Sequence, residues 1–316
     1  MNPSVAVLDV GSNTIKILVA VRDARGGLSP LLSRAIDARI SAGIGQAAPR
    51  LSDEGMAAAM AAIHQLLADA APFGPVRMDI VATSAVRDAS NGAEFAARVA
   101  RETGCEMRVL SGTEEAAGIG LGLTCDPALA DAANFYVFDL GGGSLECLAF
   151  ENREPRQAIS LPLGCVRLTE KFVSQPAEPM RAVTWKRIMA HTRTAMAESG
   201  FRFDLVDPIA VATGGSASTA RALYGVREGR SGNETSSLLT VRQLQGQLEQ
   251  MASLPLAERK KLPGLPPERA DVYPAALATL IAVAETGGIV SYRHSYYNLR
   301  YGLATQLLKA IEVSRQ

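Results

Sequence analysis

The sequence is poor in the residues that build metal clusters and disulfide frameworks. It contains three histidines and four cysteines in 316 residues, and no two cysteines form a CxxC pair. The longest apolar run, Ala275 to Ala284, is about half of the ~20 residues that span a bilayer. The cysteines are therefore expected to be buried thiols, and no membrane helix and no membrane partner is expected.

Net charge is absent as well. The 32 Lys and Arg residues balance the 32 Asp and Glu residues, so a polyanionic ligand would have to meet a local basic patch. The amino terminus leads directly into an apolar segment without the basic and cleavage regions of a secretory signal, which favours a cytoplasmic location. A 47% apolar and 20% charged composition predicts a globular protein, and its length favours two domains.

One local pattern occurs twice, about 130 residues apart. Each copy is a buried strand that ends in an acidic residue, Asp9 or Asp139, followed by a glycine turn and a returning strand. The copies are strand, turn and strand at Val5 to Val10, Gly11 to Thr14 and Ile15 to Val21, and at Phe135 to Leu140, Gly141 to Ser144 and Leu145 to Phe150. This repetition predicts a duplicated α/β domain.

The glycine turns have the composition of a phosphate cradle. Both return as strands, whereas the Walker loop and the dinucleotide fingerprint lead into a helix. Glycine lets backbone N–H groups approach phosphate oxygens, Ser and Asn add donors, and a strand-end Asp can hold Mg²⁺. For each turn taken singly, a plain hairpin turn is the alternative. Two such turns across a cleft are typical of the actin, sugar-kinase and acetate-kinase superfamily.

Helical periodicity marks the segments between the strands. The clearest helices are predicted at Ser52 to Ala70, with Ser52 as N-cap, and at Ala93 to Thr103, closed by Gly104. Others are expected at Pro179 to Ser199, Val241 to Leu254 and Tyr273 to Thr286. His191 and His294 are expected to be solvated.

Eight motifs follow one another along nearly the whole chain. They are DVGSNTIKILVA from Asp9, TSAVRDASN from Thr83, SGTEEAAGIGLGL from Ser111, FDLGGGSLE from Phe138, LPLGCVRLTEKF from Leu161, ATGGSASTARAL from Ala212, RADVYPAA from Arg269 and NLRYGL from Asn298. In this order they resemble the exopolyphosphatase and guanosine-pentaphosphate phosphatase (Ppx/GppA) family.

The resemblance implies two actin-like (ribonuclease H-like) α/β domains with a cleft between them. Domain I is expected at residues 1–124 and domain II at 125–300, with residues 301–316 as a C-terminal helix that packs back on domain I. The chain resembles a short member without the added helical domains of long relatives, which leaves its processivity open.

The function implied is Mg²⁺-dependent release of terminal orthophosphate from polyphosphate, with Mn²⁺ as a substitute metal. The alternatives are hydrolysis of guanosine pentaphosphate (pppGpp) in the stringent response, a sensor that binds polyphosphate or an alarmone without catalysis, and a kinase on the same fold. A homodimer is expected, and nucleic acid is not an expected partner.

The resemblance also assigns roles to individual residues. Glu115 matches the general base that activates water, while a helix N-terminus is the alternative explanation for Glu114 and Glu115. Metal ligands are expected at Asp139, Glu146 and Asp9. Phosphate contacts are expected from Gly11, Ser12, Asn13, Arg87, Gly141, Gly142, Gly143 and Ser144. An ion pair with Asp88 or Glu94 is the alternative for Arg87. Second-rank anion or nucleotide contacts are Gly214, Gly215, Ser216, Arg167 and Arg300.

Overall fold

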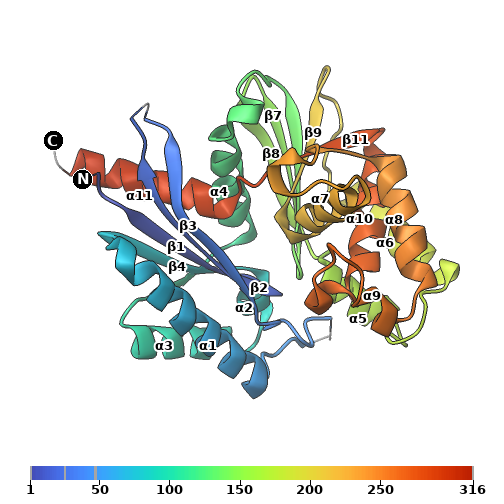
Figure 1. Ribbon diagram of the computed structural model, residues 1–316, viewed down its shortest axis with the longest axis horizontal. Coiled ribbons are helices and arrows are strands. Elements are labelled where there is room, and N and C mark those ends of the chain that lie inside the picture. Colours follow the sequence, from blue (N-terminus) through green and yellow to red (C-terminus); the bar gives the residue numbers. More distant parts are fainter. Residues whose placement is uncertain (1, 25, 46–47, 315–316) are drawn as a thin grey trace. The chain divides into compact units, whose positions relative to one another are not determined.

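The computed structural model describes residues 2–24, 26–45 and 48–314. The chain divides into two compact units (Figure 1). The first comprises Met1–Asp131 and Tyr297–Gln316, and the second comprises Ala132–Tyr296. Each unit has one mixed β-sheet.

The sheet of the first unit has five strands in the order β3-β2-β1-β4-β5. The first three strands form an antiparallel meander, and β4 and β5 continue the sheet in parallel to β1. The strands are β1 (Val5–Val10), β2 (Thr14–Arg22), β3 (Leu28–Asp37), β4 (Arg77–Ala82) and β5 (Met107–Val109). Strand β1 lies at the centre of this unit, and all but one of its residues are buried.

Helices cover both faces of β1, with α1 and α11 on opposite sides of it in Figure 1. The helices of the first unit are α1 (Asp53–Ala70), α2 (Ser84–Asp88), α3 (Gly92–Thr103), α4 (Gly112–Thr124) and α11 (Leu299–Val313), with single turns at Ala71–Phe73 and Pro127–Leu129. The C-terminal helix α11 packs on α4, β1 and β2, so the end of the chain completes the core of the first unit.

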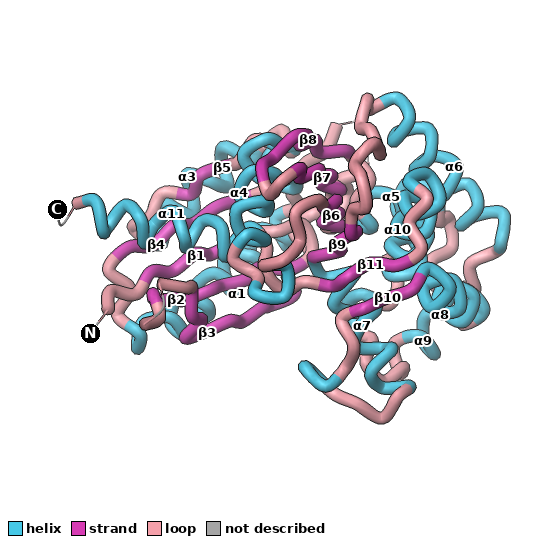
Figure 2. The backbone as a smooth tube through the Cα atoms, turned by 90° about the horizontal axis from the view of Figure 1, so that it is seen from above, coloured by secondary structure: helices cyan, strands magenta, loops and turns pink. Residues whose placement is uncertain are grey.

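The second unit has a six-stranded sheet in the order β10-β11-β9-β6-β7-β8 (Figure 2). Here too the first three strands in sequence are antiparallel neighbours, and β9 and β11 run parallel to β6. The strands are β6 (Phe135–Leu140), β7 (Leu145–Glu151), β8 (Glu154–Leu161), β9 (Ile209–Thr213), β10 (Leu238–Thr240) and β11 (Ser291–His294).

The helix α10 forms the core of the helical layer in this unit, because it packs on α5, α6, α7 and α8. The helices are α5 (Cys165–Phe172), α6 (Ala182–Glu198), α7 (Gly214–Arg227), α8 (Val241–Ser253), α9 (Leu256–Arg259) and α10 (Tyr273–Gly287), with turns at Gly232–Glu234 and Pro267–Arg269. From Tyr273 to Ala284 every side chain of α10 is buried.

The two sheets share one topology. The order β3-β2-β1-β4-β5 corresponds to β8-β7-β6-β9-β11, and β10 is an addition at one edge of the second sheet. The prediction of a duplicated actin-like α/β fold is therefore confirmed. Among the described residues, no helix is both long enough and apolar enough to cross a membrane.

Candidate active site

The glycine turn of the first unit leaves its backbone donors available. The carbonyl oxygen of Ser12 accepts from Ser41 N at 3.1 Å, and that of Asn13 accepts from Ala38 N and Arg39 N at 3.0 and 2.9 Å. Within the described parts of the chain, the N–H groups of Gly11, Ser12 and Asn13 donate to no oxygen. Consecutive unpaired amides form an anion-binding concavity.

Side chains at this turn are tied to two neighbouring segments. Ser12 Oγ lies 3.1 Å from Ser84 Oγ at the start of α2. Asn13 Nδ2 donates to Asp37 Oδ1 at 3.3 Å, and Asn13 Oδ1 accepts from Arg39 Nε at 3.2 Å. Arg39 has a left-handed backbone with φ of 41°, which is strained for a residue with a side chain. The turn therefore holds Arg39 beside it.

Asp9 precedes this turn and lies directly opposite Lys16 on β2. Its Oδ1 is buried and has no hydrogen-bond partner among the described residues. Burial raises the pKa of Asp9, and the charges of Lys16 and Arg300 counteract part of that rise. Arg300 itself donates to the carbonyl oxygen of Ile17 at 3.2 Å.

Glu115 and Arg87 form an ion pair inside the first unit. Arg87 Nη1 lies 2.9 Å from Glu115 Oε2, and Glu115 is only 7% exposed. The adjacent Glu114 has another task, since it forms a capping box with Ser111 at the start of α4. Arg87 is also 3.6 Å from Asp88, so the expected ion pair with Asp88 coexists with the one to Glu115.

Close helix packing positions the helix that carries Glu115. Gly302 of α11 lies so near Gly118 of α4 that a Cβ on Gly302 would overlap the carbonyl oxygen of Gly118. Likewise, Gly122 has no room for a Cβ beside the carbonyl oxygen of Asn298. These backbone contacts fix α4 against the C-terminal helix.

The glycine turn of the second unit is held by the first turn of α5. The carbonyl oxygens of Gly141 and Gly142 accept from Cys165 N and Val166 N at 3.0 and 2.9 Å. Arg167 Nε donates to the carbonyl oxygen of Gly143 at 2.9 Å, so this arginine orients the turn. The N–H groups of Gly142 and Gly143 donate to no oxygen of the described residues, as in the first unit.

Asp139 and Glu146 are direct cross-strand neighbours on β6 and β7. Glu146 is 2% exposed and its Oε1 accepts from Ser160 Oγ at 2.8 Å. Their counterparts in the first unit are Asp9 and Lys16, so only the second unit pairs two carboxylates here. No group of three or more potential protein ligands occurs among the described residues. Two carboxylates still suit Mg²⁺, which takes its other oxygens from water and phosphate.

Gly214 and Gly215 begin α7, and each has a side chain pressed against it. A Cβ on Gly214 would overlap Asp139 Oδ1, and its φ of 86° also favours glycine. A Cβ on Gly215 would likewise overlap the guanidinium of Arg269. Ser216 Oγ donates to the carbonyl oxygen of Leu140 at 3.3 Å, which links α7 to β6.

Sequence reasoning left Ser84, Arg39 and Arg269 without a role. Ser84 and Arg269 lie within motifs quoted above, which is the signal that could have marked them, whereas Arg39 carries no such signal. The expectation that His294 is solvated is wrong. His294 is buried beside Ser218 and Arg221, and burial lowers its pKa to about 3.

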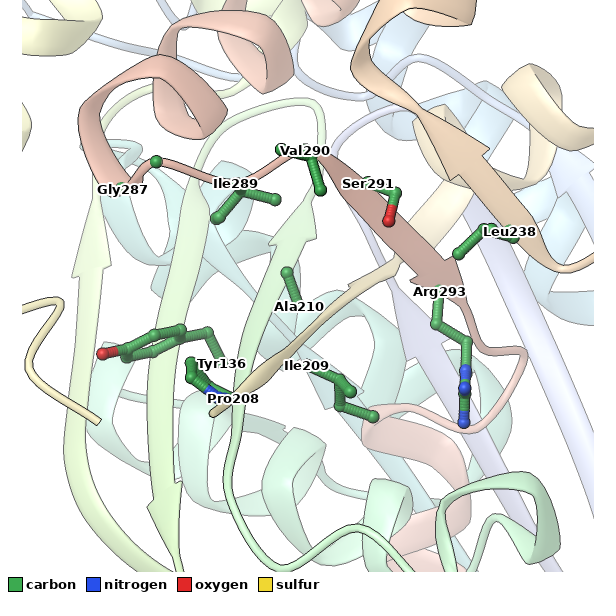
Figure 3. Close-up of a pocket in the computed structure, with 11 residues that line it drawn as sticks. Tyr136, Pro208, Ile209, Ala210, Leu238, Gly287, Ile289, Val290, Ser291 and Arg293 are labelled. Carbon is green, nitrogen blue, oxygen red and sulfur yellow. The ribbon is translucent and has the colours of Figure 1, made fainter. Parts of the chain in front are cut away.

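The second unit also has a cavity of about 240 Å³ away from these residues (Figure 3). It lies at the amino ends of β9 and β11, lined in part by Ile209, Ala210, Val290 and Arg293. Asp139 and Gly214 lie at the carboxyl ends of β6 and β9. The cavity is therefore not part of the candidate active site.

The protein family is identified by a match to a family model. The model of the Ppx/GppA phosphatase family matches residues 18–310. The chain belongs to this family. Exopolyphosphatase 1 of Mycobacterium tuberculosis is 28% identical over 307 residues, which cover 96% of this chain and 87% of that protein. Its Mycobacterium bovis counterpart gives the same values.

Solved structures agree with this Ppx/GppA assignment. The Aquifex aeolicus Ppx/GppA family member superposes with a TM-score of 0.78 at 25% identity and full coverage of both chains. An exopolyphosphatase from Cytophaga hutchinsonii superposes with a TM-score of 0.87 at 20% identity, over 97% of this chain and 98% of that one. The second likeness concerns the fold alone.

Proposed function

We propose that this Ppx/GppA member is an exopolyphosphatase, a phosphoanhydride hydrolase that releases terminal orthophosphate by water attack. The observation that carries the proposal is the buried Glu115 held by Arg87 at the first turn of α4. A carboxylate in that place accepts the proton of the attacking water. The names of the Mycobacterium relatives support polyphosphate as the substrate.

Phosphoryl transfer depends mainly on positioning and on neutralising the phosphate oxygens. The unpaired N–H groups of Gly11 to Asn13 and of Gly142 and Gly143 supply donors in the two units. Arg87 adds the N–H groups of Nη2, the guanidinium nitrogen that contacts neither Glu115 nor Leu110. In the first unit, the donors of Gly11 to Asn13 would bind and orient the terminal phosphate, and Glu115 would take the proton from water.

Magnesium fits the paired carboxylates of the second unit, and Mn²⁺ accepts the same oxygen ligands. Asp139 and Glu146 would hold the ion in the second unit. The unpartnered Oδ1 of Asp9 is a separate candidate oxygen ligand in the first unit. The ion would supply positive charge beside the phosphate oxygens.

The proposal is tested by measuring phosphate release from polyphosphate and from pppGpp, each with Mg²⁺ and with a chelator. We expect Mg²⁺-dependent release that is faster from polyphosphate, and a higher Mg²⁺ requirement in Asp139→Ala and Glu146→Ala. Binding without release would indicate a sensor, and faster release from pppGpp would replace the substrate proposed here.

A further inference from the structure

One row of oxygen-bearing side chains crosses four adjacent strands of the second sheet, β9, β6, β7 and β8 (Figure 2). Asp139 of β6 pairs with Glu146 of β7 on one side and with Thr213 of β9 on the other. Glu146 in turn pairs with Ser160 of β8. Residues that pair directly across neighbouring strands project to the same face of the sheet, ~5 Å apart. We refer to these four residues as the oxygen row.

The two hydroxyl groups at the ends of the oxygen row differ in their contacts. Ser160 Oγ donates to Glu146 Oε1 at 2.8 Å, so it holds the carboxylate beside it. Thr213 lies beside Asp139 and is 1% exposed, and its Oγ1 has no hydrogen-bond partner among the described residues. A buried hydroxyl without a partner destabilises the folded protein. The position of Thr213 Oγ1 therefore requires an explanation.

Helix capping does not explain the Thr213 hydroxyl. Thr213 is the N-cap residue of α7, a place where the threonine oxygen usually accepts from an N–H group of the first helical turn. The Thr213 side chain accepts no such bond. In the same unit, Thr240 at the N-cap of α8 does accept from Gln243 N, at 3.2 Å. The hydroxyl of Thr213 is thus withheld from the helix that it precedes.

Packing does not explain the hydroxyl either, as the duplicated fold shows. In the first unit the neighbour of Asp9 that corresponds to Thr213 is Val81, which is fully buried. Valine has the branched shape of threonine without its oxygen. The rest of that row consists of Lys16 and Ala35. The fold therefore accepts a valine at this position, and only the second unit has an uninterrupted row of oxygen groups.

The carboxylate of Asp139 leans toward the strand that carries Thr213. A Cβ on Gly214, the residue after Thr213, would overlap Asp139 Oδ1. The glycine therefore leaves room for the carboxylate beside the end of β9. Two carboxylates and a neighbouring hydroxyl are hard oxygen groups, the class of ligand that Mg²⁺ and Mn²⁺ prefer.

We propose that Thr213 Oγ1 is a third protein oxygen of the divalent-cation site formed by Asp139 and Glu146, and that it gains its missing partner when the cation binds. This inference rests on the proposed function, which assigns the cation to those two carboxylates. It adds Thr213 to the site and makes Ser160 the positioning residue of Glu146. Every residue involved belongs to the second unit.

The test compares three variants of the full chain. Thr213→Val removes the hydroxyl and keeps the side-chain shape, and Thr213→Ser keeps the hydroxyl. The matched control is Thr192→Val on α6, because Thr192 Oγ1 is also buried without a hydrogen-bond partner among the described residues but lies outside the oxygen row. Mn²⁺ binding without substrate is measured by electron paramagnetic resonance of the free ion. Thermal unfolding is measured in chelator and at one fixed Mn²⁺ concentration.

We expect Thr213→Val to raise the Kd for Mn²⁺ about tenfold, while Thr213→Ser and Thr192→Val stay within about twofold of the parent. In chelator, both valine variants should have a Tm equal to or above that of the parent, because each loses an unpartnered buried hydroxyl. The rise in Tm that Mn²⁺ causes should be smaller in Thr213→Val alone.

Three results would overturn the proposal. The first is a parental Kd in Thr213→Val, and the second is an equal loss of Mn²⁺ affinity in Thr192→Val or in Thr213→Ser. The third is a lower Tm of Thr213→Val in chelator, because the hydroxyl would then have a structural role in the metal-free protein.

Binding without substrate separates this proposal from the proposed function. If the parent binds Mn²⁺ and Thr213→Val weakens that binding, but no phosphate is released from polyphosphate, the exopolyphosphatase proposal fails and the role of Thr213 stands. If the parent releases phosphate but binds no Mn²⁺, the role of Thr213 fails and the hydrolase remains. In an active enzyme, Thr213→Val should require more Mg²⁺ and keep a kcat near the parental value at saturating Mg²⁺.

Discussion

Arg87 Nη1 donates to Glu115 Oε2 at 2.9 Å and to the carbonyl oxygen of Leu110 at 3.0 Å. One nitrogen thus joins the candidate base to the strand end before α4. The guanidinium keeps further N–H groups for phosphate, because arginine has five in a planar fork. The proposed base and the proposed phosphate contact would therefore be linked through a single side chain.

For Glu115→Gln we expect turnover to fall by ~10² to 10⁴, the range for loss of a general base. The glutamine oxygen can still accept from Arg87, so folding and anion binding should be retained. Kinetic assays with thermal unfolding measure both effects. The matched control is Glu114→Gln, since glutamine also serves in a capping box. If turnover falls equally in the two variants, Glu115 is not the general base.

Ionisation of Asp9 is expected to lower the free energy of unfolding. Because burial raises the pKa of Asp9 in the folded protein, folding favours the protonated side chain. The stability that protonation contributes is complete at pH values below the pKa of Asp9 in the unfolded chain. It is lost as pH rises through the pKa of Asp9 in the folded protein. Ionised Asp9 therefore lowers stability at neutral pH. Asp9→Asn should unfold at a higher temperature than the parent at pH 8, with the difference shrinking in acid, and should hydrolyse polyphosphate more slowly. A lower Tm at pH 8 would refute this reading.

Arg39 combines a strained backbone with a contact to the glycine turn. Arg39→Gly and Arg39→Ala both remove the hydrogen bond to Asn13, but only glycine relieves the left-handed φ of 41°. We expect Arg39→Gly to be more stable than Arg39→Ala by about 1 kcal/mol, and both to raise KM for polyphosphate equally. Denaturant titration and steady-state kinetics measure the two effects. If both variants keep the parental KM, the Arg39 side chain has no part in binding polyphosphate.

Two helical glycines should respond oppositely to one substitution. Gly302→Ala should destabilise the protein by ~1–3 kcal/mol, because its Cβ overlaps the backbone of α4. Gly246→Ala in α8 should stabilise by ~0.5–1 kcal/mol, because no atom lies within 4 Å of its Cβ position. Chemical denaturation compares them. A stabilising Gly302→Ala would contradict the close packing of α4 on α11.

The buried strands and glycine turns could be predicted because their signals are local. Strands β1, β2, β6 and β7 are nearly continuous apolar runs, and Ser52 caps α1 as its sequence indicates. The edge strands β3 and β8 were not predicted, since most of their residues are exposed or half-buried and show no apolar run. Their positions depend on pairing with β2 and β7.

Candidate site residues could be chosen from the sequence, but the contacts that these residues make in the structure could not be predicted. The spacing of Ser111 and Glu114 matches a capping box, which separates the tasks of Glu114 and Glu115. No pattern in the sequence brings Arg39 to Asn13 or Arg269 to Gly215, because the two partners of each contact lie far apart in the chain.

The most direct test of water attack on the terminal phosphate is hydrolysis of polyphosphate in ¹⁸O-labelled water, with mass analysis of the products. The account predicts a single labelled oxygen in each released orthophosphate and none in the shortened chain. Label in the shortened chain, or phosphate transferred to another acceptor without label, would contradict it.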